Sequence, residues 1–193
     1  MTAKNETWRE TDIITTERLK LVPWEDTEAD AREIFRIASN PNIGPHAGWK
    51  PHESLEESRR ILREMFLPFG GGNDAFSIRL KDTGRVIGNI SVYEDSAREN
   101  VKSLEIGYWL DEAEWHKGYM TEACMAVQDY AFLKYDLAIM AIRTSNVNMR
   151  SQGVIRNCGF TYEGTIRKAY HIYTGEDRDS RIYSITREEW EAR

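Results

Sequence analysis

Two neighbouring segments organise this chain: Leu104-Glu105-Ile106-Gly107-Tyr108-Trp109-Leu110 and His116-Lys117-Gly118-Tyr119-Met120-Thr121-Glu122-Ala123. In the first segment, apolar residues take alternate positions, which is the period of a β-strand. After the second segment, side chains recur at helical spacing, at Ala123, Val127, Tyr130, Ala131 and Lys134. The two segments therefore predict a strand, a short polar loop over residues 111–115 and the start of a helix.

The joint between this loop and the helix carries the dipeptide Lys117-Gly118. Free N–H groups and the helix dipole attract anions at a helix start, and a glycine lets a phosphate approach the backbone closely. The joint is thus a candidate phosphate site. A strand–loop–helix unit without a ligand is the alternative, because such units occur in every α/β protein.

The composition is that of one globular domain. The 193 residues are 40% hydrophobic and 30% charged, and roughly 70% of the unfolded surface can be buried at this length. The net charge of −6 argues against direct binding of nucleic acid. A negative field gathers cationic substrates such as amines, although many chains are acidic for solubility alone.

The cysteines and histidines do not suggest a disulfide or a metal. Cys124 and Cys158 each lie in an apolar pattern, so we expect two buried free thiols in a reducing compartment. The four histidines lack the spacing of metal ligands. The chain shows no signal-peptide pattern and no apolar run of 18 residues. These patterns predict a cytoplasmic protein that does not bind membranes.

Before the central strand, the sequence predicts an arm, two helices and three strands. Residues 1–16 are polar and form an N-terminal arm or one added turn, and a single domain spans residues 17–193. A strand over 17–24 leads to a helix capped by Asp26 or Thr27, and Ser54 opens a second helix with the capping-box pattern. Residues 76–80 and 86–92 alternate around a turn and predict an antiparallel hairpin.

The segment after the central helix predicts three strands and two helices. Residues 137–144 are apolar and predict a buried strand parallel to the central one. Residues 146–151 lead into a helix that ends near Gly159. Residues 162–170 and 181–185 predict two closing strands, and Thr186 begins the capping box of a last helix. No repeat or domain linker interrupts this order.

This order of elements, with three segments, resembles the GNAT superfamily of acetyl-CoA-dependent N-acetyltransferases. The segments are residues 16–21, 106–123 and 148–160, where the last contains Asn148-Met149-Arg150-Ser151. Within the superfamily, the chain is similar to the RimJ/RimL-type branch of ribosomal-protein N-terminal acetyltransferases. The resemblance implies an α+β fold, with a mostly antiparallel mixed sheet, one splayed parallel pair of strands and flanking helices.

The resemblance implies acetyl-CoA as cosubstrate. Pantetheine would lie between the splayed strands, where one backbone N–H would polarise the thioester carbonyl. The pyrophosphate would lie on the loop and helix start, where the Lys117 side chain adds a charge or is solvated. The implied cofactor residues are Tyr108, Trp109, Leu110, His116, Lys117, Gly118, Tyr119, Met120, Thr121, Asn148 and Ser151.

Two positions depart from the superfamily's usual pattern of arginine or glutamine, two residues, glycine, one residue, then glycine or alanine. Trp115 stands at the arginine or glutamine position, and Met120 stands at the last position. Trp115 removes a side-chain donor and leaves the loop intact. Met120 adds bulk at the helix start.

The implied reaction is direct transfer of acetyl to a primary amine in a ternary complex. Glu105 resembles an acidic position used in the family and is the candidate base, acting through a water; an ion pair or a substrate anchor is the alternative. Ser151 is the candidate donor to the departing thiolate, or a cap of the first helical turn. Asn148 either bonds pantetheine or is the helix N-cap. Helical spacing places Cys124 in the interior, so we expect no acetyl-cysteine.

The resemblance favours the α-amine of a ribosomal protein, another protein or a peptide as acceptor. A small-molecule amine, such as a polyamine, amino sugar or antibiotic, is the alternative acceptor. A non-catalytic acyl-CoA-binding module is the alternative of another class, and Glu105 and Ser151 argue against it. The candidate acceptor-binding residues are Trp49, Phe69 and Tyr170, and the loop over 44–52 is either a pocket wall or a packed connector. The resemblance also allows a homodimer.

Overall fold

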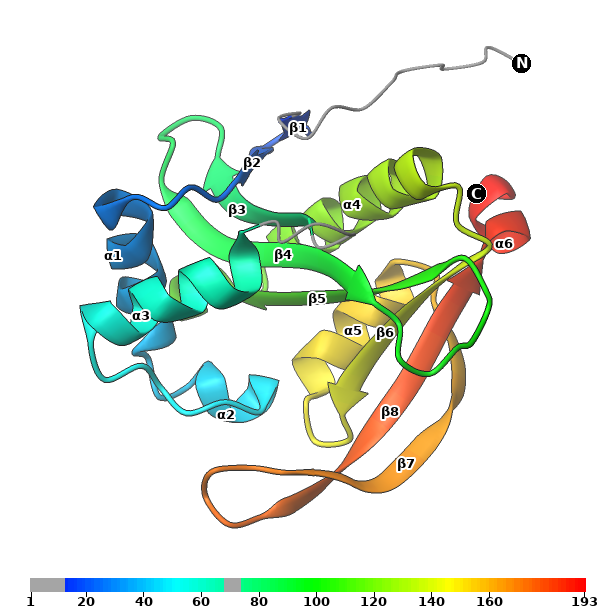
Figure 1. Ribbon diagram of the computed structural model, residues 1–193. Helices are drawn as coiled ribbons and strands as arrows, with labels where there is room; N and C mark the ends of the chain where they lie inside the picture. The colour runs from blue at the N-terminus through cyan, green and yellow to red at the C-terminus, as the bar shows by residue number, and fades with distance from the viewer. Residues whose placement is uncertain (1–12, 68–73) are drawn as a thin grey trace.

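An eight-stranded sheet runs through the computed structural model, which describes residues 13–67 and 74–193 (Figure 1). The strands are β1 (Ile14–Thr15), β2 (Leu19–Pro23), β3 (Asp74–Leu80), β4 (Val86–Glu94), β5 (Ser103–Leu110), β6 (Ile139–Ser145), β7 (Thr161–His171) and β8 (Asp177–Thr186). Their order across the sheet is β1-β2-β3-β4-β5-β6-β8-β7, and only β5 and β6 are parallel. This arrangement confirms the predicted fold class.

Six α-helices lie in the described residues, and some of them begin at a capping side chain. They are α1 (Glu28–Ala38), α2 (Gly44–Ala47), α3 (Leu55–Ile61), α4 (Tyr119–Tyr135), α5 (Met149–Asn157) and α6 (Arg187–Glu191). The side chains of Thr27 and Ser54 accept hydrogen bonds from first-turn N–H groups of α1 and α3. Thr186 and Glu189 form the predicted capping box of α6. A π-helical turn, Leu62–Phe66, extends α3.

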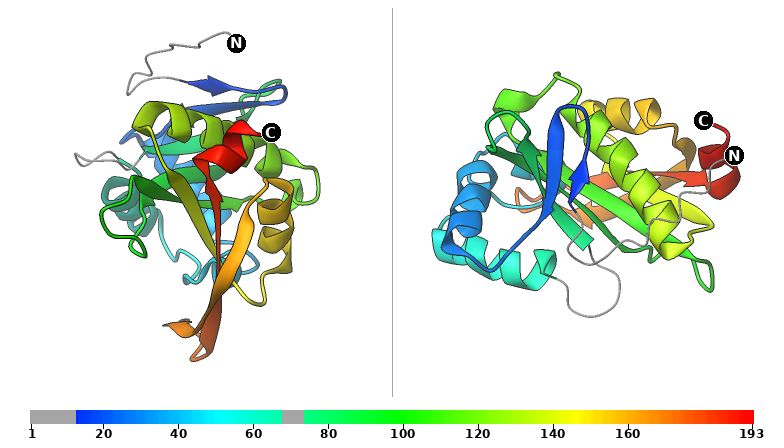
Figure 2. Two further views of the ribbon diagram at one scale, coloured as in Figure 1. Left: turned by 90° about the vertical axis from the view of Figure 1, so that its right-hand side faces the viewer. Right: turned by 90° about the horizontal axis from the view of Figure 1, so that it is seen from above.

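Helices cover both faces of the sheet (Figures 1 and 2). On one face, α4 and α5 pack on the strands through a core that includes Val127, Phe132 and Ile155. On the other face, α1 and the π-helical turn enclose a second core around Trp24 and Leu62. The sheet is therefore buried on both faces in its central strands, which fixes the positions of side chains on β4, β5 and β6.

The parallel strands β5 and β6 pair over only part of their length. Their register runs from Ser103 opposite Ile139 to Ile106 opposite Ile142. Beyond this point β6 pairs with β8 alone and turns away from β5 (Figure 1). From Gly107 onward, β5 has a strand partner only on its β4 side within the described residues. The splay leaves backbone N–H and C=O groups of β5 available to a bound molecule.

Some features were not predicted from the sequence. Ile14 and Thr15 lie within the predicted N-terminal arm, yet they form β1, in which Ile14 pairs with Leu21. Residues 1–12 of that arm lie outside the described residues. The closing strands β7 and β8 are longer than predicted at both ends. In the described parts of the chain, the helices are all too short or too polar to cross a membrane.

Candidate active site

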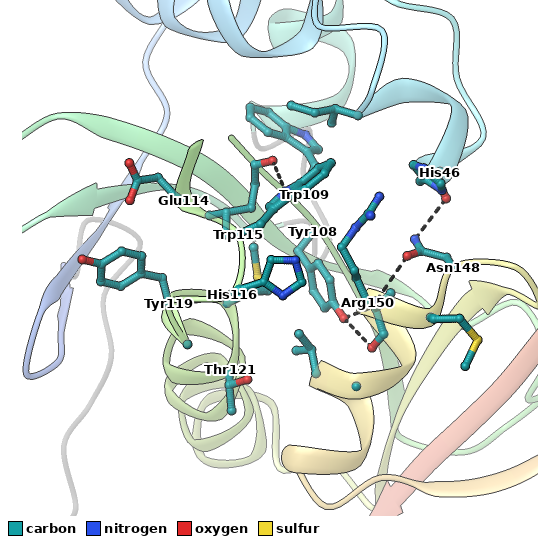
Figure 3. A pocket seen from close by; sticks show the side chains of 18 of the residues that line it. His46, Tyr108, Trp109, Glu114, Trp115, His116, Tyr119, Thr121, Asn148 and Arg150 are labelled. Carbon is teal, nitrogen blue, oxygen red and sulfur yellow. Dashed lines mark hydrogen bonds between the residues drawn. The ribbon is translucent and has the colours of Figure 1, made fainter. Parts of the chain in front are cut away.

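Two cavities meet at the splayed end of β5. The helix-start cavity, of about 590 Å³, lies between the end of β5, the start of α4 and the start of α5 (Figure 3). The sheet-face cavity, of about 780 Å³, lies between the sheet and α1–α3 and reaches the β7–β8 hairpin. The residues that line both cavities mark their junction: His46, Ala47, Tyr108, Trp109, Asn148 and Ser151.

The loop that enters α4 has the backbone geometry of a candidate anion site at the helix-start cavity. His116 and Gly118 take left-handed φ angles of 63° and 81°, and glycine is the residue that adopts this region without strain. The helix then begins without a side-chain cap. The first-turn carboxylate of Glu122 is held by Arg18 and Thr16 instead. The N–H groups of a 17-residue helix are thus free to bind an anion.

The predicted cofactor residues gather around this cavity, with one exception. All of them line it except Lys117. The ammonium of Lys117 pairs with Glu114 at 3.1 Å, and half of its side chain is exposed. The lysine side chain therefore pairs with a carboxylate of the cavity lining and does not itself line the cavity.

Arg150 is a cavity residue that the sequence analysis missed. Its guanidinium carbon lies 4.0 Å from the centre of the Trp115 ring, so the cation stacks on the indole (Figure 3). The Trp115 indole N–H donates to the carbonyl oxygen of Leu110 at 3.0 Å, which fixes the ring under the end of β5. Within the described residues, Arg150 forms no ion pair. Arg150 on α5 thus adds a positive charge to the cavity. The loop before α4 carries Trp115 in place of the arginine or glutamine that is usual in the family.

The core between α4 and the end of α5 holds the predicted free thiols. Cys124 and Cys158 are both buried and unbridged, as predicted. A hydrogen bond with Cys158 and burial raise the pKa of the Cys124 thiol well above its usual value. Met120, the second departure from the family pattern, is buried in the same core. A thiol held neutral in the interior is a poor nucleophile at neutral pH.

Tyr108 and Asn148 fix Ser151 at the junction. The hydroxyl oxygens of Tyr108 and Ser151 are 3.0 Å apart. Burial raises the pKa of the Tyr108 phenol, so the phenol keeps its proton. Asn148 is the N-cap of α5: its Oδ1 accepts from the Ser151 N–H at 3.2 Å, and its Nδ2 donates to the His46 carbonyl oxygen at 3.2 Å.

Glu105 lies beneath the floor of the sheet-face cavity and is 4% exposed. The Arg143 Nε donates to its carboxylate at 2.7 Å, and the Tyr93 hydroxyl donates at 3.0 Å. Tyr93 and Arg143 line the cavity, and Glu105 lies behind them. Gly107 makes room for Tyr93, because a Cβ there would lie 2.9 Å from the tyrosine ring. The ion pair across β5 and β6 corresponds to the alternative that the sequence left open for Glu105.

Two of the three acceptor-binding candidates line the sheet-face cavity. Trp49 and Tyr170 both line it, whereas Phe69 lies outside the described residues. The Tyr170 ring rests against Gly48, where a Cβ would lie 3.4 Å from a ring carbon. Arg178 donates to the Pro45 carbonyl oxygen at 2.7 Å and ties the β7–β8 hairpin to the α2 segment. The loop over 44–52 is therefore a wall of the cavity.

The sequence of this chain matches a known family over most of the elements that build the two cavities. Residues 18–161 match the family described as "Acetyltransferase (GNAT) domain". The chain belongs to the GNAT acetyltransferases. Members of this family are N-acetyltransferases that use acetyl-CoA, so the resemblance seen in the three sequence segments is confirmed.

Three similar proteins illustrate the range of this GNAT family. "Uncharacterized N-acetyltransferase YoaA" of Bacillus subtilis is 26% identical over 176 residues, which cover 91% of this chain and 97% of YoaA. "Putative ribosomal N-acetyltransferase YdaF" of Bacillus subtilis is 34% identical over 90 residues, 47% of this chain and 49% of YdaF. The crystal structure of the microcin C7 self-immunity acetyltransferase MccE, in complex with acetyl-CoA and AMP, has a TM-score of 0.75 and 23% identity, and the match covers 89% of this chain and 93% of MccE.

Proposed function

We propose that this GNAT acetyltransferase transfers acetyl from acetyl-CoA directly to the N-terminal α-amine of a peptide or protein. The observation that carries the proposal is the engagement of Glu105 by Arg143 and Tyr93. Because Glu105 lies behind these two side chains and does not line the cavity, it can take a proton from the acceptor only indirectly. An α-amine has a pKa of about 8 and a lysine amine about 10.4, so an α-amine needs much less help to lose its proton near neutral pH.

Acetyl-CoA would occupy the helix-start cavity and the junction. Its pyrophosphate suits the loop over His116–Thr121 and the positive charge of Arg150. Its pantetheine arm suits the splay between β5 and β6, where backbone groups of Tyr108 and Trp109 have no strand partner on the β6 side within the described residues. The likeness in fold to MccE, which was solved with acetyl-CoA, supports this placement.

The acceptor would reach the thioester from the sheet-face cavity. Its nitrogen forms a bond to the acetyl carbon, and the bond from that carbon to sulfur breaks. The amine proton passes through a water toward Glu105, whose carboxylate is one hydrogen bond behind the Tyr93 hydroxyl. The thiolate accepts a hydrogen bond from Ser151 and takes its proton from solvent. Cys124 has no part in this route, because it is buried in the core.

Two observations bear on the choice between a protein acceptor and a small-molecule acceptor. The name of the relative YdaF describes a ribosomal N-acetyltransferase, which supports a protein acceptor. A small-molecule amine remains the rival, because the chain's negative charge attracts cationic amines. The indirect access of Glu105 to the cavity favours the acceptor that loses its proton more readily, which is the α-amine.

The test is thiol release from acetyl-CoA with peptides, spermidine and an aminoglycoside as acceptors. Each peptide is compared with the same sequence carrying a blocked N-terminus and a free internal lysine. We expect free-N-terminus peptides to be acetylated at the α-amine, as seen by mass spectrometry. Acetylation of the blocked peptides at lysine, or of spermidine alone, would contradict the proposal.

A further inference from the structure

We infer that the sheet-face cavity selects an amine next to an apolar or aromatic group, with no second positive charge near the reacting nitrogen. The inference rests on the proposed function and deepens it: the first residue of the acceptor peptide carries a large apolar side chain. It follows from the charges, the aromatic walls and the histidines of the cavity.

The cavity offers no counter-ion to a second ammonium group. Among the described residues that line it, none is an aspartate or a glutamate. Arg143 is the lining residue with a permanent charge, and that charge is balanced by Glu105 beneath it. A polyamine, an aminoglycoside or an N-terminal lysine would bring an extra ammonium into this space. Because a buried unpaired charge loses its hydration without compensation, such acceptors are disfavoured.

The histidines of the cavity add no positive charge at neutral pH. Burial lowers the pKa of His46, and the nearby Arg150 and Arg178 lower it further. Burial also lowers the pKa of His52, although Glu57 opposes the change. Both imidazoles are therefore neutral near pH 7, and the interior keeps its neutral balance.

Aromatic rings supply the walls. Phe66 and Trp109 both line the cavity, with their ring centroids 6.4 Å apart, and the buried Trp24 stacks on Phe66 at 6.1 Å. Trp49 and Tyr170 add two further aromatic rings to the cavity lining. Aliphatic side chains complete the apolar lining: Ile34, Ile61 and Ile166. A large apolar side chain next to the amine would bury its surface here, which is favourable in proportion to the area removed from water.

The test compares kcat/KM for four peptides that differ only in the first residue, which is Phe, Leu, Ser or Lys. Phenethylamine and spermidine are two further arms. We expect the Phe and Leu peptides to exceed the Ser and Lys peptides at least tenfold. A Ser or Lys peptide, or spermidine, that matched the Phe peptide would overturn the inference and leave the proposed function intact. If phenethylamine were the best acceptor, the preference for an apolar group would stand and the assignment of a peptide acceptor would be overturned. If none of these amines were acetylated, both would be overturned.

Introduction of a negative charge into the cavity lining tests the cause of this preference. Met65 lines the cavity and is 60% exposed, so Met65→Glu adds a carboxylate without disturbing the core. We expect it to raise kcat/KM for the Lys peptide about tenfold relative to the Phe peptide. The matched control is Met125→Glu, at a residue of α4 that is 41% exposed and lies away from the cavity. An equal change in both variants would overturn the inference.

Removal of one aromatic wall tests the apolar contact. Tyr170→Ala should lower kcat/KM for the Phe peptide about fivefold more than for the Ser peptide. Tyr173→Ala is the control, because Tyr173 lies in the turn of the same hairpin, is 46% exposed and does not line the cavity. A loss for the Ser peptide as large as that for the Phe peptide would show that Tyr170 has no role in the preference.

Discussion

The hydroxyl oxygens of Tyr108 and Ser151 lie 3.0 Å apart at the junction of the two cavities. Tyr108 comes from β5 and Ser151 from the first turn of α5, so the bond crosses the space that opens when β5 and β6 part. The phenol restricts the rotation of the serine hydroxyl. In the proposed reaction, this contact would orient Ser151 to donate a hydrogen bond to the departing thiolate.

Ser151→Ala should lower kcat about ten- to a hundredfold, because a hydrogen bond to a charged group contributes roughly 1.5–3 kcal/mol. The α5 cap should persist, since the Asn148 side chain bonds the backbone N–H of residue 151. The measurement is kcat together with the thermal unfolding midpoint. Tyr108→Phe, which keeps the ring and loses the hydroxyl, should show a smaller loss of kcat. An unaltered rate in Ser151→Ala would leave Ser151 with a structural role alone.

Glu105→Gln should lower turnover about a hundredfold, the lower range of a general-base contribution. The KM for acetyl-CoA should stay within twofold, because Glu105 lies beneath the acceptor cavity and not the cofactor cavity. The measurement is initial rates against both substrates. Glu99→Gln, in an exposed loop, is the control. Wild-type turnover in Glu105→Gln would reject the base role and leave the ion pair with Arg143 as its function.

Arg150→Met should weaken acetyl-CoA binding about tenfold through loss of a charge-assisted contact to phosphate. Turnover of acetyl-pantetheine, which lacks the nucleotide phosphates, should stay within twofold of the wild type. Calorimetric titration and initial rates measure the two effects. Arg156→Met is a matched change at an exposed position of the same helix, outside the cavity. Equal losses for both acetyl donors would contradict the phosphate contact.

Asp74 should make stability sensitive to acid. Burial alone would raise its pKa, but hydrogen bonds from Lys134, Tyr130 and Tyr135 on α4 outweigh burial and lower the pKa. A lowered folded-state pKa stabilises the fold above the unfolded value of about 3.9, and that stability is lost as pH falls through the folded value.

Asp74→Asn should therefore lower the unfolding midpoint at pH 7 by about 3–8 °C, from a loss of roughly 1–3 kcal/mol. The difference in unfolding midpoint between Asp74→Asn and the wild type should narrow toward pH 3. Thermal unfolding followed by circular dichroism from pH 3 to pH 7 measures both. Asp82→Asn, in an exposed turn, is the control. A difference in unfolding midpoint that does not change with pH would show that the carboxylate charge does not stabilise the fold.

The sequence predicted most of the fold because its elements carry local signals. Alternation marks β3, β4 and β5, and Thr27, Ser54 and Thr186 mark helix starts. The two-residue strand β1 was missed because Ile14 and Thr15 are too few to show a period; their pairing with β2 is a tertiary effect. The extra length of β7 and β8 likewise comes from pairing within an exposed hairpin.

The site was only partly predictable. The residues of the helix-start cavity are close in sequence to two recognisable segments, so most of them could be named. Arg150 could not be named, because its stacking on Trp115 joins two elements whose relative position the sequence does not give. The pairing of Glu105 with Arg143 is similar: the two residues lie 38 positions apart and meet because β5 and β6 are neighbours.

Two-substrate kinetics test the central claim most directly. Initial rates of thiol release would be measured against acetyl-CoA at several fixed concentrations of a peptide with a free N-terminus. If acetyl-CoA and the peptide occupy adjoining cavities and react directly, double-reciprocal plots will intersect and no acetyl group will remain on the protein. Parallel lines, with acetyl found on the protein by mass spectrometry, would contradict direct transfer across the junction.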